Sequence, residues 1–217
     1  MTLIRIAGLS LAAFMCCWTS IPAAPTDREI PRPEAVFGHQ PGADRTVIGY
    51  DALVDYFQTV ADRSDRVDLH RVGKTTQGRD LVMLVISTPE NLRHADRYRE
   101  TAAKLDDPRG LSSDEIDRLV TEGKVILSVS LNIHSDEIAV SQMSPEWVYE
   151  LATGGADSPA RYLEDVIVLL FPSLNPDGQM MVTDWYLKQR GTVHEGTDLP
   201  WLYHPYAGHD NNRDWFM

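Results

Sequence analysis

The sequence predicts an α/β fold with a mixed, mostly parallel central sheet flanked by helices. Two apolar runs, at residues 125–133 and 165–171, carry this prediction, because aliphatic and β-branched residues in such runs are typical of strands covered on both faces. Stretches with apolar residues at helical spacing lie before and between them. Polar residues follow both runs directly, at the strand ends where open α/β sheets bind their ligands.

The first half of the chain combines a helix with a hairpin. Residues 48–60 carry an apolar stripe at helical spacing, which indicates a helix packed on the core. Residues 67–72 and 81–87 are expected to be strands, joined by a glycine-rich turn at residues 73–79. Asp68 stands where a phosphate-binding loop would need its first glycine, so we interpret the turn as a plain hairpin connection.

The remaining elements are expected to cover the sheet. Charged helices are predicted at residues 92–105 and 112–121. The helix after the first apolar run contains Pro145, which should kink or split it. The last forty residues are rich in Trp, Tyr, His and Gly, and we expect a long irregular segment there that helps to build a site.

Length and charge bound the class of protein. The chain has 217 residues, of which 43% are hydrophobic and 24% charged, enough for one globular domain with a sizeable core. Its net charge of −12 argues against a nucleic-acid partner, because binding phosphates requires clustered Lys and Arg.

The N-terminus predicts export to the periplasm or the extracellular space. Residues 1–23 combine Arg5, an apolar run and a small-residue cleavage site, which together are typical of a signal peptide. The run is short for a membrane span, and an uncleaved anchor is the alternative. After cleavage we expect no membrane contact and no disulfide, because Cys16 and Cys17 leave with the signal. Residues 24–45, with four prolines, are expected to form an extended arm, and residues 46–217 the globular part.

His134 and Glu137 are the first candidate functional residues. They follow the first apolar run with a spacing of three, and imidazole nitrogen and carboxylate oxygen are both zinc ligands. A strand-to-helix corner can direct both side chains at one point. The alternative is a surface turn in which the acid caps the next helix.

Two further polar motifs follow the His134–Glu137 pair along the sequence. Asn-Pro-Asp-Gly occupies residues 175–178, after the second apolar run, and Asp-Asn-Asn-Arg-Asp-Trp occupies residues 210–215. In this order, with the Gly-x-Thr-x-x-Gly-Arg turn at residues 73–79, they resemble the zinc carboxypeptidases of the carboxypeptidase A type. The resemblance covers residues 46–217.

The resemblance implies a role for each matching residue. His134 and Glu137 would be two of three protein ligands to Zn²⁺, and Asp210 would orient His134 through its other ring nitrogen. Asn212 and Arg213 would hold the terminal carboxylate of a peptide or protein substrate. For Arg213, the alternative is a structural ion pair with a neighbouring aspartate.

Arg190 is a weaker match. It stands twelve residues after Gly178, where the family has an arginine that polarises the scissile carbonyl, although the sequence around it is not typical of the family. The alternative is an exposed surface charge.

The resemblance also implies two functional residues that this sequence does not contain. The family's third ligand, a histidine, and its catalytic glutamate lie well beyond the Asn-Arg segment, so we expect a fold truncated at the C-terminus. His194, His204 and His209 are less favoured as a local third ligand.

The sequence therefore predicts an exported zinc metallocarboxypeptidase that removes C-terminal residues from peptides, with this fragment alone inactive. The alternatives are a zinc amidase or deacylase acting on cell-wall peptides or N-acyl amino acids, and a non-catalytic peptide-binding relative.

Overall fold

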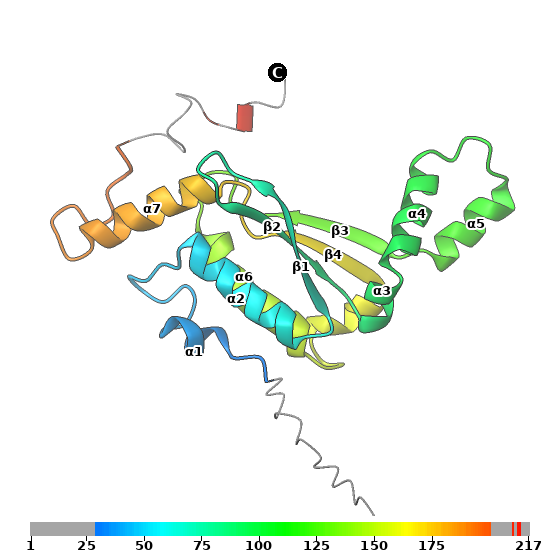
Figure 1. Cartoon of the computed structure of the whole chain (residues 1–217), viewed down its shortest axis with the longest axis horizontal. Coiled ribbons are helices and arrows are strands. Elements are labelled where there is room, and N and C mark those ends of the chain that lie inside the picture. Colours follow the sequence, from blue (N-terminus) through cyan, green and yellow to red (C-terminus); the bar gives the residue numbers. More distant parts are fainter. Residues whose placement is uncertain (1–28, 201–209, 211, 214–217) are drawn as a thin grey trace, which may run out of the picture.

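The computed structural model describes residues 29–200, 210, 212 and 213, and shows a sheet with helices around it (Figure 1). In chain order the elements are α1 (Pro33–Phe37), α2 (Tyr50–Arg63), β1 (Val67–Lys74), β2 (Asp80–Ile86), α3 (Pro89–Arg93), α4 (Ala95–Asp106), α5 (Ser113–Glu122), β3 (Val125–Ser130), α6 (Ala139–Thr153), the 3-10 helix η1 (Pro159–Glu164), β4 (Val166–Phe171) and α7 (Pro176–Gln189). No helix of the described residues is both long and apolar enough to cross a membrane.

The sheet is mixed, with strand order β1-β2-β4-β3. β1 pairs antiparallel with β2 through the predicted hairpin, and β2 pairs antiparallel with β4. Among the described strands, only β3 and β4 run parallel. The described strands thus form the mixed α/β sheet that we expected, but its parallel part is limited to one pairing because the hairpin brings β2 back beside β4.

The strand β3 lies at an edge of the described sheet, whereas its apolar sequence predicted a central, buried strand. Among the described strands it is an edge, paired only with β4, and Val125, Ile126 and Leu127 are 62%, 37% and 45% exposed. An apolar run indicates a strand suited to burial on both faces, yet Val129 is the residue of β3 that packs against the core, and the first four residues of the strand are exposed. The strand also ends at Ser130, three residues before the expected boundary.

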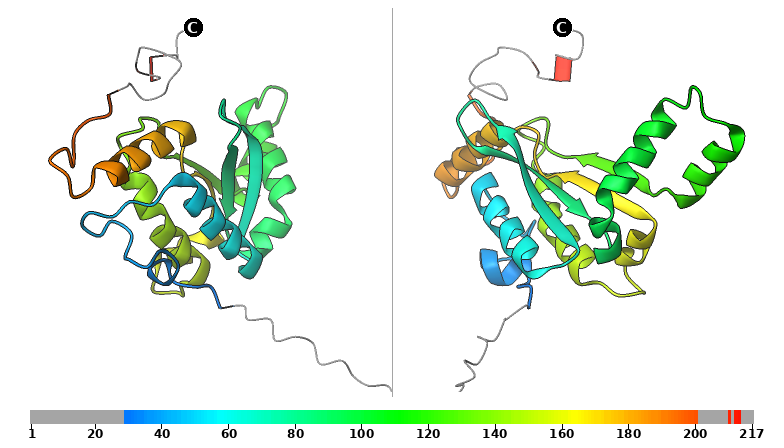
Figure 2. Two further views of the ribbon diagram at one scale, coloured as in Figure 1. Left: turned by 60° about the vertical axis from the view of Figure 1, so that its left-hand side comes forward. Right: turned by 45° about the vertical axis from the view of Figure 1, so that its right-hand side comes forward.

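The core lies between the sheet and the helices α2 and α6, which pack against each other on one side of it (Figure 2). β2 contributes alternate buried residues, as expected for a strand with one face on the core. The apolar stripe predicted for residues 48–60 is buried except at Ala52. The main buried residues of α2 and β2 are Leu53, Tyr56, Phe57, Val60, Leu84 and Ile86.

Pro145 lies inside α6 without splitting it. Proline has no N–H, so the carbonyl of Ser141 loses its usual helical partner four residues on. The hydroxyl of Ser144 donates to that carbonyl at 2.7 Å and replaces the missing bond. A buried side chain therefore satisfies the acceptor that the proline leaves, and the helix continues to Thr153.

Three segments differ from the sequence-based predictions. The arm is not fully extended, because Pro33 begins the short helix α1, whose Phe37 packs on the core. The helix predicted at residues 92–105 is two helices, α3 and α4, separated at His94. The region expected to be irregular opens with α7, a helix of 14 residues.

Candidate metal and substrate site

The segment that leads to His134 is held by the turn after β4. The backbone N–H of Leu174 donates to the carbonyl of Leu131 at 2.8 Å, and that of Asn175 to Asn132 at 3.2 Å. The side-chain amide of Asn175 donates to the carbonyl of Ile133 at 3.3 Å. Three consecutive residues beyond the end of β3 are thus fixed by the neighbouring parallel strand's turn.

Asn132 turns the chain at this point. Its φ is 53°, a left-handed conformation that asparagine tolerates better than other non-glycine residues. The side chain is buried, and its amide donates to the carbonyl of His134 at 2.7 Å. The apolar run at residues 125–133 predicted that Asn132 belongs to a strand, although an asparagine near the end of an aliphatic run is also a signal for a turn.

The Asn-Pro-Asp-Gly motif starts α7. The side-chain oxygen of Asn175 accepts from the N–H of Gly178 at 3.0 Å, which is an N-cap, and Pro176 occupies the first helical position. These are ordinary helix-start signals, and they could have predicted α7 from the sequence. One residue thus caps a helix and holds the segment before His134.

Asp177 joins this turn to the β1–β2 hairpin. Its carboxylate, 5% exposed as a residue, accepts bonds from the Thr75 hydroxyl at 2.9 Å, the Gln77 N–H at 3.1 Å and the Arg79 guanidinium at 2.8 Å. The glycine-rich turn and the Asn-Pro-Asp-Gly turn, far apart in the sequence, therefore form one hydrogen-bonded unit. The sequence identified both motifs but not their contact.

The imidazole of His134 lies between two carboxylates. Its Nδ1 is 3.0 Å from Glu137 Oε2, and its Nε2 is 2.9 Å from Asp210 Oδ1. The hydrogen bond to Glu137 is the largest cause that raises the pKa of His134, and Asp210 adds to it against the opposing effect of burial. The structure thus brings together three of the predicted site residues.

Asp210 is itself held in place. The backbone N–H of Asn212 donates to Asp210 Oδ1 at 2.8 Å, and this bond is the largest cause that lowers the pKa of Asp210. Arg213 Nη2 lies 3.5 Å from the other oxygen of Asp210, so the ion pair considered as an alternative is present. Its guanidinium remains mostly exposed, with 67% of the side chain accessible, and is free to bind a second carboxylate.

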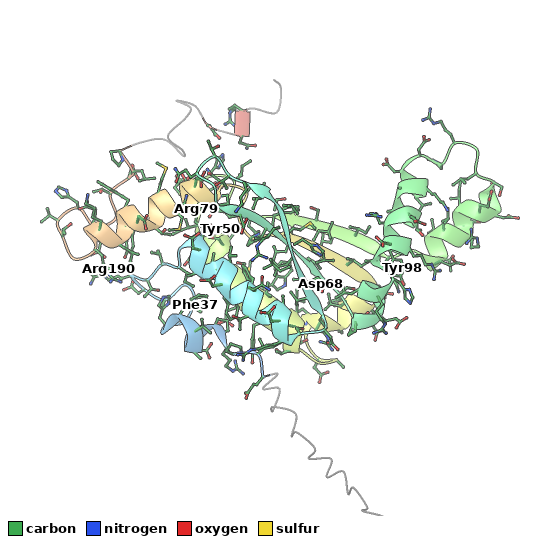
Figure 3. The ribbon with its side chains drawn as sticks, viewed as in Figure 1. Phe37, Tyr50, Asp68, Arg79, Tyr98 and Arg190 are labelled. Carbon is green, nitrogen blue, oxygen red and sulfur yellow. The ribbon has the colours of Figure 1, made fainter. Side chains whose placement is uncertain are left out.

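Arg190 is not brought to this group. It follows the last residue of α7, and its Nη1 donates to the carbonyl of Arg45 at 3.2 Å. Figure 3 shows Arg79 near the start of α7 and Arg190 at the other end. Twelve helical residues span about 18 Å, so α7, which the sequence did not predict as a helix, places Arg190 far from His134 and Glu137. The surface-charge alternative describes its position better.

His134 and Glu137 fit two ligand positions of a zinc site. Two atoms bound to one tetrahedral zinc lie about 3.4 Å apart, close to the 3.0 Å between Nδ1 and the carboxylate. Asp210 occupies Nε2, so Nδ1 is the ring nitrogen on the side of Glu137. Within the described residues, no group of three or more His, Cys, Asp or Glu side chains could hold a metal. His194 is exposed on the loop after α7, and His204 and His209 lie outside the described residues.

Comparison with known protein families identifies the class to which this chain belongs. The zinc carboxypeptidase family matches residues 53–216, most of the chain. The chain belongs to the zinc carboxypeptidase family. No curated protein matches it significantly.

Several solved carboxypeptidases are similar. The metallo-carboxypeptidase from Burkholderia cenocepacia is 19% identical with a TM-score of 0.46, over 78% of this chain and 33% of that one. The carboxypeptidase A from Helicoverpa armigera is 15% identical with a TM-score of 0.44, over 73% and 32%. A putative carboxypeptidase A from Shewanella denitrificans is 18% identical with a TM-score of 0.44, over 76% and 31%. This chain spans about a third of the length of these relatives.

The bonds to Asp177 predict a specific loss of stability. Asp177→Asn keeps the size of the side chain but removes the charge that pairs with Arg79, and should lower the free energy of unfolding by about 1–3 kcal/mol. Urea denaturation of the intact protein measures this. The control is Asp51→Asn, because exposed Asp51 lies 3.8 Å from the same guanidinium and should contribute less than about 0.5 kcal/mol. Equal losses in the two variants would contradict the role given to Asp177.

Proposed function

We propose that the protein containing this chain is an exported zinc metallocarboxypeptidase that removes residues from the C-termini of peptides and proteins. One observation carries the proposal. The imidazole of His134 is fixed by Asp210 on one nitrogen and faces Glu137 with the other, while Arg213 extends from the same aspartate into solvent. Family membership supports the same class of reaction.

The residues of this chain would hold and orient the metal. His134 would bind through Nδ1 and Glu137 through its carboxylate, while Asp210 keeps the ring in one orientation and tautomer. A bound zinc supplies Lewis acidity and lowers the pKa of a coordinated water. This chain would contribute the orientation of the ligands. Side chains that are already held in place need not be ordered when the metal binds.

Arg213 and Asn212 would select the end of the substrate. A guanidinium presents two parallel N–H donors that match a carboxylate, and Asn212 adds a side-chain amide. Because Asp210 contacts both His134 and Arg213, a carboxylate bound by Arg213 would lie close to a metal bound by His134 and Glu137. A substrate whose last carboxylate binds there would present its terminal peptide bond to the metal.

An amidase or deacylase acting on cell-wall peptides or N-acyl amino acids is the nearest alternative. Such an enzyme can use the same metal pair but has no need for a guanidinium beside it. The exposed Arg213 therefore favours the carboxypeptidase. Arg190 has no part in the proposal, because its guanidinium is engaged with the backbone of Arg45 at the far end of α7.

Asp210 is expected to control metal affinity. In the intact protein, Asp210→Asn should lower zinc affinity by about 10- to 100-fold, since losing the charge on a ligand's hydrogen-bond partner weakens the ligand. Competition with a chelator measures the affinity, and circular dichroism checks that the fold is kept. Asp136→Asn is a suitable control, because Asp136 is an exposed acid beside the ligand Glu137. Unchanged zinc affinity in Asp210→Asn would remove Asp210 from the site.

Arg213 is expected to distinguish carboxypeptidase from amidase. Arg213→Ala should reduce kcat/KM for a peptide with a free C-terminus by about 2–5 kcal/mol of transition-state stabilisation, because the substrate carboxylate loses its partner. The same peptide with an amidated end should lose much less. Comparing both substrates in both proteins gives a double-mutant cycle. An equal loss on the two substrates would make Arg213 structural and reopen the choice of reaction.

Export is part of the proposal and can be tested directly. Arg5 and the apolar run after it predict cleavage near Ala23 and release into the periplasm or medium. N-terminal sequencing of the exported protein should give a start close to residue 24. Material that still begins at Met1 would instead indicate an uncleaved anchor or no export.

A further inference from the structure

A cavity of about 540 Å³ borders the segment between His134 and Glu137. Ser135 and Asp136, which lie between His134 and Glu137 in the chain, form one side of it. The middle of α7 and the loop after α7 form the other sides. If a peptide binds at His134 and Glu137, one of the peptide's own side chains can therefore reach this cavity.

The walls of the cavity are largely apolar. Val182, Trp185 and Tyr186 line it from α7, with Ile138 and Leu199 from the flanking segments. Such a surface favours the apolar part of a ligand, and the indole and phenol rings also attract cations to their faces.

The loop that closes the cavity is fixed to the rest of the fold. Glu195 accepts two bonds from the Arg45 guanidinium, both at 2.7 Å, one from the N–H of Gly191 at 2.7 Å and one from the Tyr186 hydroxyl at 3.3 Å. The Trp185 indole donates to the carbonyl of Thr197 at 3.0 Å. The arginine neutralises Glu195, so this acid adds no net charge near the cavity.

The charged side chains that line the cavity are all negative. Asp136 and Asp198 line it as exposed carboxylates, and no Lys, Arg or His is among its described lining residues. Ser135 is fully buried, and its hydroxyl has no hydrogen-bond partner among the residues that the structure describes. The cavity is thus lined by two negative charges and by a buried hydroxyl that has no partner among the described residues.

We propose that this cavity binds an arginine or lysine side chain of the substrate, at one of the three positions before the C-terminal residue. The proposal rests on the proposed peptidase function and names its substrate preference. The aliphatic stem would lie on Trp185 and Val182, and the cationic head would reach Asp136 and Asp198. A neutral apolar side chain would fill the walls but leave both carboxylates without a partner, and an acidic one would be repelled.

A peptide series with a single changed residue tests the preference. The peptides have a free C-terminus. In each peptide, one of the three positions before the terminal residue is arginine, norleucine or glutamate, and the other positions are kept constant. At one of these positions the intact protein should show kcat/KM about 3- to 10-fold higher for arginine than for norleucine, as expected for one or two partly exposed ion pairs. Glutamate should be the poorest of the three.

Two substitutions connect the preference to the cavity. Asp198→Asn should reduce the preference for arginine by about two- to five-fold. Asp184→Asn, which removes the same charge from an exposed residue of α7 outside the cavity, should leave it unchanged. Val182→Trp, which fills the cavity, should abolish the preference even if Asp198→Asn proves unstable.

A binding measurement separates this proposal from the peptidase assignment. Isothermal titration uses the same peptides with a free C-terminus, in which a ketomethylene group replaces the terminal peptide bond. This linkage cannot be hydrolysed, so the titration measures binding to the cavity without turnover. Tighter binding of arginine than norleucine, lost in Val182→Trp, would support the cavity even if no peptide is hydrolysed. Norleucine binding as tightly as arginine, with no effect of Asp198→Asn, would overturn it.

Discussion

The buried carboxylate of Asp177 is the contact on which the geometry of the site depends. It accepts three bonds from the β1–β2 hairpin turn and lies in the first turn of α7, two residues after Asn175. Asn175 in turn holds the backbone just before His134. The position of the proposed metal ligand is thus set by a chain of hydrogen bonds that begins in a hairpin more than fifty residues earlier.

This arrangement explains why short, scattered motifs can specify a site. A buried carboxylate with an unpaired charge is costly, so Asp177 is stable only where its donors are in place. The N-cap of α7 and the left-handed Asn132 also work only in one local geometry. Each motif satisfies its own polar groups, and together they leave His134 between Glu137 and Asp210 with little freedom to rotate.

Local patterns predicted much of the fold. The strands and the hairpin depend on residue type and spacing within a few positions, and the structure has both. The pair of His134 with Asp210 came from the family resemblance, and the structure places the two side chains in contact. Contacts between distant motifs, such as Asp177 with Arg79, are not encoded in any local pattern.

The differences between the sequence-based predictions and the structure also arise from contacts and geometry that local patterns do not contain. The apolar run of β3 predicted burial, but burial depends on what covers a strand, and the described residues leave it as an edge. Arg190 matched by counting residues along the chain, but a helix converts that count into distance, and α7 carries the residue away. Asn175 followed by Pro176 was a helix start that composition alone did not reveal.

The central claim is that Asp210 occupies one nitrogen of His134 so that the other faces Glu137 and can take a metal. The most direct test is a crystal structure of the intact protein with zinc, with anomalous data collected above and below the zinc absorption edge. The account predicts one zinc peak within about 2.0–2.2 Å of both His134 Nδ1 and a Glu137 carboxylate oxygen, with Asp210 still on Nε2. Zinc bound to Nε2, or a peak away from Glu137, would contradict it.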